Sequence, residues 1–287
     1  MRKSKRDYQT ELEKKAEINY YTMRDGAKVR VLDFNLAKNP HEYKIFLVPG
    51  FITVFQSWHR VVELLSKKYR VYYFESREKA SSKMPWKLKR KINLHKMAFD
   101  IKEVIEQMNL DQQKYIVLCS STGGTIEIEA LKNNWHKPAG AVMVGPTVEY
   151  HVSHFGAFLV QLVPGFIKNL FMPILRWYLG KKYVDAEKEP EQRAKYVRAA
   201  EEADIWKIRR LLRQFTKYKC WDMVPEVTTP VLLIGASVDK MHSTEECLKT
   251  HELMPNSQYI DLGSNKAAHS DPLVKEIEKY IEYLKNQ

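Results

Sequence analysis

The chain has 287 residues, of which 44% are apolar, so it is long enough for one large domain with a full hydrophobic core. Its formal net charge of +12 favours anionic partners, although a lysine-rich solvated surface is the more ordinary interpretation. The three cysteines, Cys119, Cys220 and Cys247, argue against a small disulfide-stapled scaffold and favour a reducing compartment.

Apolar, β-branched runs alternate with helical patterns in the first half of the chain, which predicts strand–helix units on a mostly parallel sheet. The first two runs flank Asp25-Gly26, a signal for a hairpin with a two-residue turn. Helices are expected around 55–66 and 94–108, and another directly after residue 119. The expected strands are 18–23, 28–34, 44–48, 70–75, 114–119 and 140–145.

The strand pattern stops after residue 148 and returns near the end of the chain. From Glu149 to Cys220 the sequence is helical, first apolar and then charged. Strands are expected again at 230–235 and 257–263, followed by a helix at 272–283. The sequence therefore predicts a core of residues 1–148 and 223–287, interrupted by a helical cap of residues 149–222.

The strongest local motif follows the predicted strand 114–119. The strand runs directly into Ser120-Ser121-Thr122-Gly123-Gly124, and a helix leaves at once. A serine at such a turn is presented at the top of the sheet, next to the positive end of the helix dipole and its free N–H groups. The alternative is a simple Ser/Gly-rich helix cap.

The motif Cys119-Ser120-Ser121-Thr122-Gly123 resembles the G-x-S-x-G nucleophile elbow of the α/β-hydrolase superfamily, with Cys119 in place of the first glycine. The resemblance implies a mostly parallel central sheet flanked by helices, with a helical cap inserted after the sixth strand. It is closest to capped esterases and monoacylglycerol-lipase-like hydrolases, and it covers nearly the whole chain.

A nucleophilic serine needs a base and an acid that orients it, and in this superfamily the order along the chain is Ser, acid, His. Asp239 follows the predicted strand 230–235, and His269 follows 257–263. Both lie beyond the carboxyl ends of strands, where sites of α/β proteins gather. The resemblance therefore implies the catalytic set Ser121, Asp239 and His269. His242 is a competing histidine, and Glu149 is an alternative acid.

The oxyanion hole requires two backbone N–H groups. Thr122 follows the nucleophile and supplies one. Pro49-Gly50-Phe51 resembles the superfamily's His-Gly loop, so Phe51 is expected to supply the other, unless the segment is only a Pro-Gly turn.

The segment 74–82 resembles the superfamily's D-x-R-G-x-G-x-S stretch more loosely. Glu75 and Arg77 fit it, whereas Glu78 and Ala80 replace its glycines. We expect this loop to be structural.

The predicted cap begins with an apolar stretch at 151–180, broken at Pro164-Gly165 and Pro173 and too interrupted to span a membrane. These residues either pack on the core or form an apolar acyl-binding cleft under a lid that touches a lipid interface. Four residues at its end would suit an anionic membrane surface: Arg176, Trp177, Tyr178 and Lys181.

The expected function is that of a serine esterase acting on an apolar acyl ester. An acyltransferase, a thioesterase, a C–C hydrolase or a non-enzymatic ligand-binding member are the alternatives. We expect no metal and no cofactor, because there is no zinc-spaced cluster and no phosphate-binding glycine loop. The basic segments Met1–Arg6 and 87–91 lack a nucleic-acid-binding motif. No apolar signal follows the basic start, so the expected location is cytoplasmic, with peripheral membrane contact as an alternative.

Overall fold

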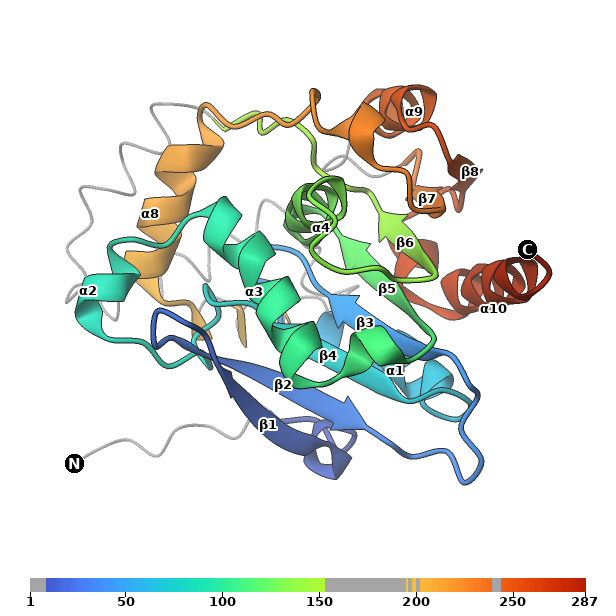
Figure 1. Ribbon diagram of the computed structural model, residues 1–287, viewed down its shortest axis with the longest axis horizontal. Helices are drawn as coiled ribbons and strands as arrows, with labels where there is room; N and C mark the ends of the chain where they lie inside the picture. The colour runs from blue at the N-terminus through green and yellow to red at the C-terminus, as the bar shows by residue number, and fades with distance from the viewer. Residues whose placement is uncertain (1–8, 153–194, 196–197, 200–201, 239–243) are drawn as a thin grey trace, which may run out of the picture.

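The computed structural model describes residues 9–152, 195, 198–199, 202–238 and 244–287. Within these residues, eight strands form one sheet in the order β1-β2-β4-β3-β5-β6-β7-β8 (Figure 1). The strands are β1 (Glu17–Thr22), β2 (Lys28–Phe34), β3 (Lys44–Val48), β4 (Val71–Glu75), β5 (Tyr115–Ser120), β6 (Gly140–Val144), β7 (Val231–Gly235) and β8 (Ser257–Asp261).

The direction of the strands brings the predicted site segments to one edge. β2 runs antiparallel to both β1 and β4, and the other neighbouring pairs are parallel. The carboxyl ends of β3, β5, β7 and β8 therefore lie along the same edge, which is where loops of α/β sheets form binding sites. Every predicted strand is present, with ends within two residues of those expected.

The hairpin between β1 and β2 differs from the prediction, because its turn is longer than two residues. Met23 N–H donates to the Ala27 carbonyl at 2.8 Å, so three residues lie between the pair that closes the turn. Gly26 takes the left-handed conformation, with φ of 85°, that a three-residue hairpin loop requires. The Glu103 carboxylate accepts from Arg24 N–H at 3.2 Å and holds this longer turn from another part of the chain.

Helices cover both faces of the sheet, as Figure 1 shows. One face carries α1 (His59–Leu65) and α10 (Asp271–Lys285); the other carries α3 (Leu94–Gln107), α4 (Thr122–Lys132) and α9 (Thr244–Leu253). The alternation of strand side chains supplies both cores: on β3, Phe46 and Val48 join the core under α3 and α4, and Ile45 and Leu47 join the opposite one. The helix expected at 55–66 is split into the 3₁₀ turn Phe55–Ser57 and α1.

Two further helices lie beside each other at the left of Figure 1: α2 (Trp86–Lys89) and α8 (Ile205–Phe215). Gln214 Nε2 on α8 donates to the Ile92 carbonyl at 2.9 Å, which joins α8 to the segment that follows α2. α8 lies in the described part of the predicted cap. It presents a buried face to the core in addition to the solvated face expected there.

Most of the predicted cap, including its apolar stretch and residues 176–181, lies outside the described residues, so its boundaries stay a prediction. No helix in the described part of the chain is both long and apolar enough to cross a membrane.

Candidate active site

Ser121 lies in the sharp turn between β5 and α4, where the elbow was expected. Its backbone has φ of 48° and ψ of −123°. A non-glycine residue in this region is strained, by roughly 1–3 kcal/mol, and persists only where the surrounding structure enforces it. Strained residues of this kind cluster at functional sites, so the backbone singles out Ser121 among the serines of the segment.

Glycines after Ser121 allow α4 to pack close to the end of β3. A Cβ on Gly123 would lie 2.2 Å from the Val48 carbonyl oxygen, and a Cβ on Gly124 would lie 2.7 Å from the Pro146 Cβ. Both distances are too short for a side chain. The second glycine of the elbow is therefore required by packing against backbone.

Cys119, which stands where the superfamily has the first glycine, is fully buried in the core under α3 and α4. Burial raises the pKa of its thiol well above the ordinary value, so the thiolate that a cysteine nucleophile needs is disfavoured. Cys119 is thus a packing residue and is not suited to act as a thiolate nucleophile.

The two residues expected to form the oxyanion hole flank Ser121. Thr122 is the first residue of α4, so its N–H is one of the helix-start groups that lack an intrahelical acceptor. The loop after β3 also reaches the serine, because a Cβ on Gly50 would lie 3.1 Å from the Ser121 Cβ. Phe51 follows directly, and Ile52 after it has a positive φ of 56°.

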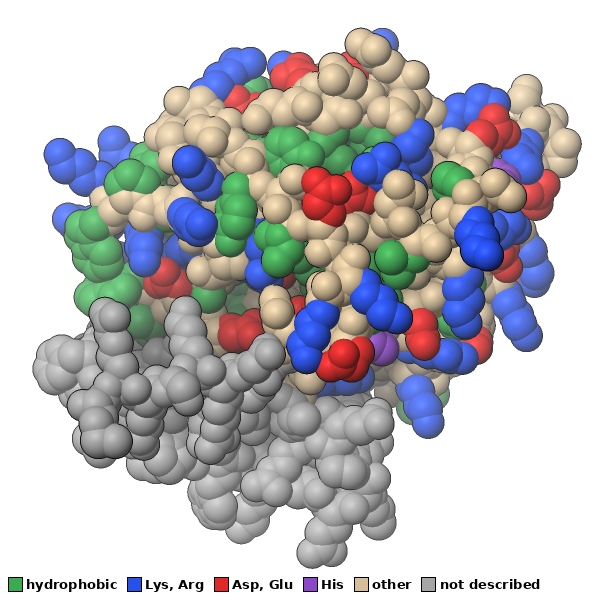
Figure 2. Space-filling model, turned by 90° about the horizontal axis from the view of Figure 1, so that it is seen from below, with side chains coloured by type: hydrophobic (Ala, Val, Ile, Leu, Met, Phe, Trp, Pro, Cys, Tyr) green, Lys and Arg blue, Asp and Glu red, His purple; other side chains and the backbone are tan. Residues whose placement is uncertain are grey.

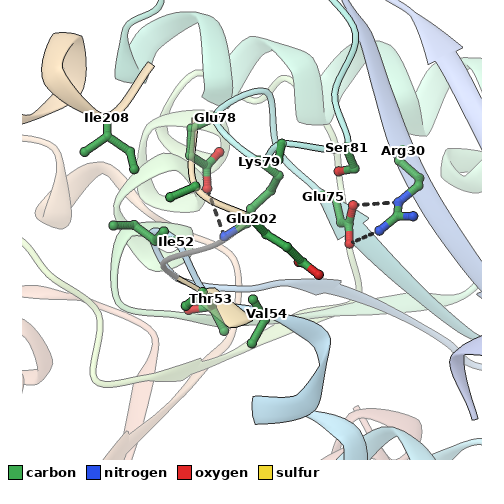
Figure 3. Close-up of a pocket in the computed structure, with 13 residues that line it drawn as sticks. Arg30, Ile52, Thr53, Val54, Glu75, Glu78, Lys79, Ser81, Glu202 and Ile208 are labelled. Carbon is green, nitrogen blue, oxygen red and sulfur yellow. Dashed lines mark hydrogen bonds and ion pairs between the residues drawn. The ribbon is translucent and has the colours of Figure 1, made fainter. Parts of the chain in front are cut away.

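Lys79 holds the peptide that joins Gly50 to Phe51, and sequence reasoning missed it. Its ammonium donates to the Gly50 carbonyl at 2.6 Å and pairs with Glu78 at 3.0 Å. Figure 3 shows Lys79 pointing toward the loop that carries Ile52 and Thr53. A cavity of about 40 Å³ lies there, lined also by the Arg30–Glu75 ion pair.

Thr147 and Tyr150, from the segment after β6, complete the surroundings of the serine, and sequence reasoning missed them too. The hydroxyl oxygens of Ser121 and Thr147 lie 3.2 Å apart. The Tyr150 hydroxyl donates to Thr122 Oγ1 at 3.0 Å, and burial raises its pKa. These contacts fix the start of α4.

Aromatic side chains form an apolar wall beside the loop that follows β3. The Tyr150 and Phe215 rings stack with centroids 4.0 Å apart, and the Phe51 ring meets Phe215 edge-on at 5.0 Å. Because Phe215 ends α8, this helix of the predicted cap contributes to the surroundings of the site.

His269 ends a 3₁₀ turn after β8, on the same edge of the sheet. Its Nδ1 lies 2.9 Å from the Asn265 carbonyl oxygen, and its ring centroid lies 4.7 Å from that of Trp58. A carbonyl oxygen only accepts, so Nδ1 is the donor in this contact.

Asp239 and His242 lie outside the described residues. The residue before Asp239 is anchored: Val238 N–H donates to the Gly263 carbonyl at 2.9 Å, which ties the loop after β7 to the loop after β8. The alternative acid Glu149 accepts a hydrogen bond from the Trp221 indole at 2.7 Å. The sequence assignment of the acid remains a prediction.

The loop 74–82 has the structural role expected for it. Arg77 is buried and pairs with Asp100 and, at 2.8 Å, with Asp25 in the β1–β2 turn. Lys207 of α8 reaches the same loop, donating to the Lys79 carbonyl at 2.7 Å and to Ser82 Oγ at 2.6 Å. Within the described residues, no group of three or more His, Cys, Asp or Glu side chains could hold a metal ion.

Comparison with known proteins gives one family match. The profile of a family described as serine aminopeptidase, S33, matches residues 39–259. Comparison with curated protein sequences gives no match.

Solved structures share the fold over nearly the whole chain. An enol-lactonase from Burkholderia xenovorans has a TM-score of 0.73 at 14% identity and covers 94% of this chain and 100% of its own. An esterase from Rhodococcus sp. has 0.71 at 18%, covering 93% and 99%. A bromoperoxidase from Bacillus anthracis has 0.70 at 16%, covering 94% and 100%. The fold is therefore the α/β-hydrolase fold, as the resemblance implied.

Proposed function

Because the chain belongs to the serine aminopeptidase S33 family of the α/β-hydrolase superfamily, we propose that it is a serine hydrolase that cleaves a carboxylic ester with an apolar acyl group. The observation that carries the proposal is the strained backbone of Ser121 at the β5–α4 turn. The shared fold alone would not support the proposal, because proteins with this fold catalyse different reactions.

In the proposed first half-reaction, Ser121 Oγ attacks the ester carbonyl carbon while Nε2 of His269 takes the hydroxyl proton. The N–H groups of Phe51 and Thr122 bind the oxyanion that forms. The tetrahedral intermediate collapses, the bond to the alkoxy oxygen breaks, and His269 returns the proton to the leaving alcohol.

In the second half-reaction, His269 takes a proton from water, which attacks the acyl-enzyme. The acid is released and Ser121 regains its proton. Asp239 is the residue proposed to hold the imidazole, because it follows β7 in the chain order of the superfamily, and it would share the Nδ1 proton with the Asn265 carbonyl. The wall formed by Phe51, Tyr150 and Phe215 supports an apolar acyl group beside the oxyanion hole.

The family's description makes an aminopeptidase the second candidate. It needs the same nucleophile and base, but its substrate is an amide with a free amino group. A panel of p-nitrophenyl esters of increasing acyl length, run beside aminoacyl p-nitroanilides, separates the two. Turnover of the anilides alone would favour the peptidase.

The test of the serine itself is labelling with a fluorophosphonate probe. Wild type is expected to be labelled, and Ser121→Ala and His269→Ala are expected to lose labelling, the first completely and the second by about 10³-fold or more in rate. Ser120→Ala, one residue earlier on β5, is the matched control and is expected to keep it. A folded wild type that is not labelled would falsify the hydrolase proposal.

A further inference from the structure

Two tryptophans lie exposed against each other on neighbouring helices, far apart in the sequence. Trp86 begins α2 and Trp206 lies in the first turn of α8. Their exposed fractions are 49% and 44%, and the rings meet edge-on with centroids 4.8 Å apart. Tryptophan side chains are mostly buried on average, and adjacent exposed ones indicate an interaction site.

Cations surround this pair. The chain has no acidic residue between Glu78 and Asp100, and none between Asp204 and Asp222. On α8, Arg210 and Arg213 continue the exposed face that Trp206 begins, at the spacing that places residues on one side of a helix. The exposed lysines and arginines of the two segments are Lys83, Lys87, Arg90, Lys91, Arg210, Arg213, Lys217 and Lys219. Figure 2 shows Lys and Arg side chains together with hydrophobic ones at the left edge, the side on which Figure 1 places α2 and α8.

Side-chain contacts join α2 and α8. Lys89 on α2 pairs with Asp204 at 2.7 Å, and Asp204 also caps α8 by accepting from Trp206 N–H. The Gln214 side chain bonds backbone groups of both Ile92 and Leu94. Contacts at both ends of α8 therefore hold the exposed tryptophans and cations in fixed relation.

We propose that this face, Trp86 and Trp206 with the surrounding cations, docks on an anionic lipid surface. Tryptophan prefers the level of lipid headgroups, where its apolar ring is buried and its indole N–H stays near water. Lysine and arginine around it reach phosphate groups while their stems lie on apolar surface. The rings meet edge-on and leave no parallel platform for bases, which favours lipid over nucleic acid.

The position of the face fits the proposed substrate. Trp206 and Phe215 lie about 14 Å apart along the axis of α8. Phe215 contacts Phe51 beside the proposed oxyanion hole. Docking would hold the site close to a bilayer that dissolves apolar esters. The face differs from residues 176–181, which the sequence suggested for membrane contact. Its benefit to catalysis rests on the proposed function, but its binding to lipid does not.

The test is flotation of the full chain with phosphatidylcholine vesicles, with and without phosphatidylserine, in the absence of substrate. Wild type is expected to bind the phosphatidylserine vesicles at least about tenfold more tightly, and the preference is expected to shrink as salt is added. Trp86→Ala/Trp206→Ala is expected to weaken binding about tenfold or more. Lys87→Glu/Arg90→Glu is expected to weaken binding at least about fivefold for each substituted residue.

Matched controls lie on other helices. Lys275→Glu/Lys279→Glu changes the same charge on α10, at the opposite side of Figure 1, and Leu248→Ala/Leu253→Ala removes two exposed apolar side chains from α9. Both controls are expected to bind as wild type does, and all variants are checked by thermal melting.

Three outcomes overturn the inference. Wild type does not bind the anionic vesicles, or the α2 and α8 variants bind as the controls do, or a DNA duplex competes the protein off the vesicles and binds more tightly than lipid. Fluorophosphonate labelling of the same preparations separates the two proposals. If vesicle binding is absent and labelling is intact, only the lipid-docking proposal is contradicted.

Discussion

At the scale of single residues, the loop proposed to bind the oxyanion is held by a side chain from another segment, Lys79. The carbonyl of the peptide between Gly50 and Phe51 accepts from the Lys79 ammonium, and the N–H of the same peptide is the Phe51 donor proposed for the oxyanion. A charged donor on the carbonyl orients the peptide and polarises its N–H, which strengthens the bond to a developing oxyanion. Thr53 N–H also donates to this carbonyl, at 3.3 Å, but it is neutral.

Lys79→Met is expected to lower kcat for ester hydrolysis about 10- to 100-fold with little change in KM, because the bond it supports strengthens only in the transition state. Steady-state kinetics measures the split. Glu78→Gln is the matched control, since it removes the ion pair but keeps the bond to Gly50, and it is expected to retain most of the activity. Equal losses in the two variants, or a rise in KM alone, would contradict the positioning role.

At the scale of elements, α8 is connected to the core through a buried cation. Lys207 is 1% exposed, and its ammonium reaches the loop 79–82. Among the described residues, the nearest carboxylate that pairs with it is Asp204, at 4.0 Å. Burial lowers its pKa to about 8, against the attraction of Asp204. The ammonium that makes this contact is therefore expected to lose its proton at a lower pH than an exposed lysine does.

The pH dependence of stability follows from this shift. Between about pH 8 and the unfolded pKa of about 10.4, the unfolded chain holds a proton that folded Lys207 has released, so the free energy of unfolding rises with pH. Relative to Lys207→Met, wild type is expected to gain about 2–3 kcal/mol between about pH 7 and pH 10.5. Urea unfolding at both pH values measures the difference.

Lys217→Met, an exposed change in the same segment, is the control and is expected to show no such pH-dependent difference from wild type. A difference between wild type and Lys207→Met that falls as the pH rises would show that Lys207 is charged in the folded state throughout this range.

At the scale of the whole molecule, the core on the α3, α4 and α9 side of the sheet buries all three thiols. Cys119 lies on β5, Cys220 follows α8, and Cys247 lies on α9. Each is a free cysteine, and burial raises the pKa of both Cys220 and Cys247 to about 12. Thiolate is therefore scarce at every one of them while the fold is closed.

A thiol-reactive chromogenic reagent is expected to modify the native protein at less than about a tenth of its rate with a free thiol, and all three cysteines are expected to react once denaturant unfolds the chain. The number of thiols that react is measured as a function of denaturant concentration and compared with unfolding followed by circular dichroism. Rapid reaction of one thiol in the native state would show a local opening, and Cys→Ala variants would identify it.

The sequence by itself determined the strands, the fold class and the elbow. Strand alternation, the length of apolar runs and the small residues after Ser121 are local properties, and local sterics restrict the backbone that each segment adopts. The placement of Ser121 and His269 beyond strand ends also followed from their position in the chain, because parallel strands bring their carboxyl ends to one edge.

Only the tertiary structure decided which distant segments meet. Lys79 and Gly50 are 29 residues apart, Thr147 and Ser121 are 26 apart, and Glu103 holds the β1–β2 turn across 79 residues. The meeting of Trp86 with Trp206 likewise depends on how α8 packs. No local period encodes such pairs, because they depend on the order of strands in the sheet and on side-chain packing that the chain forms only when it closes.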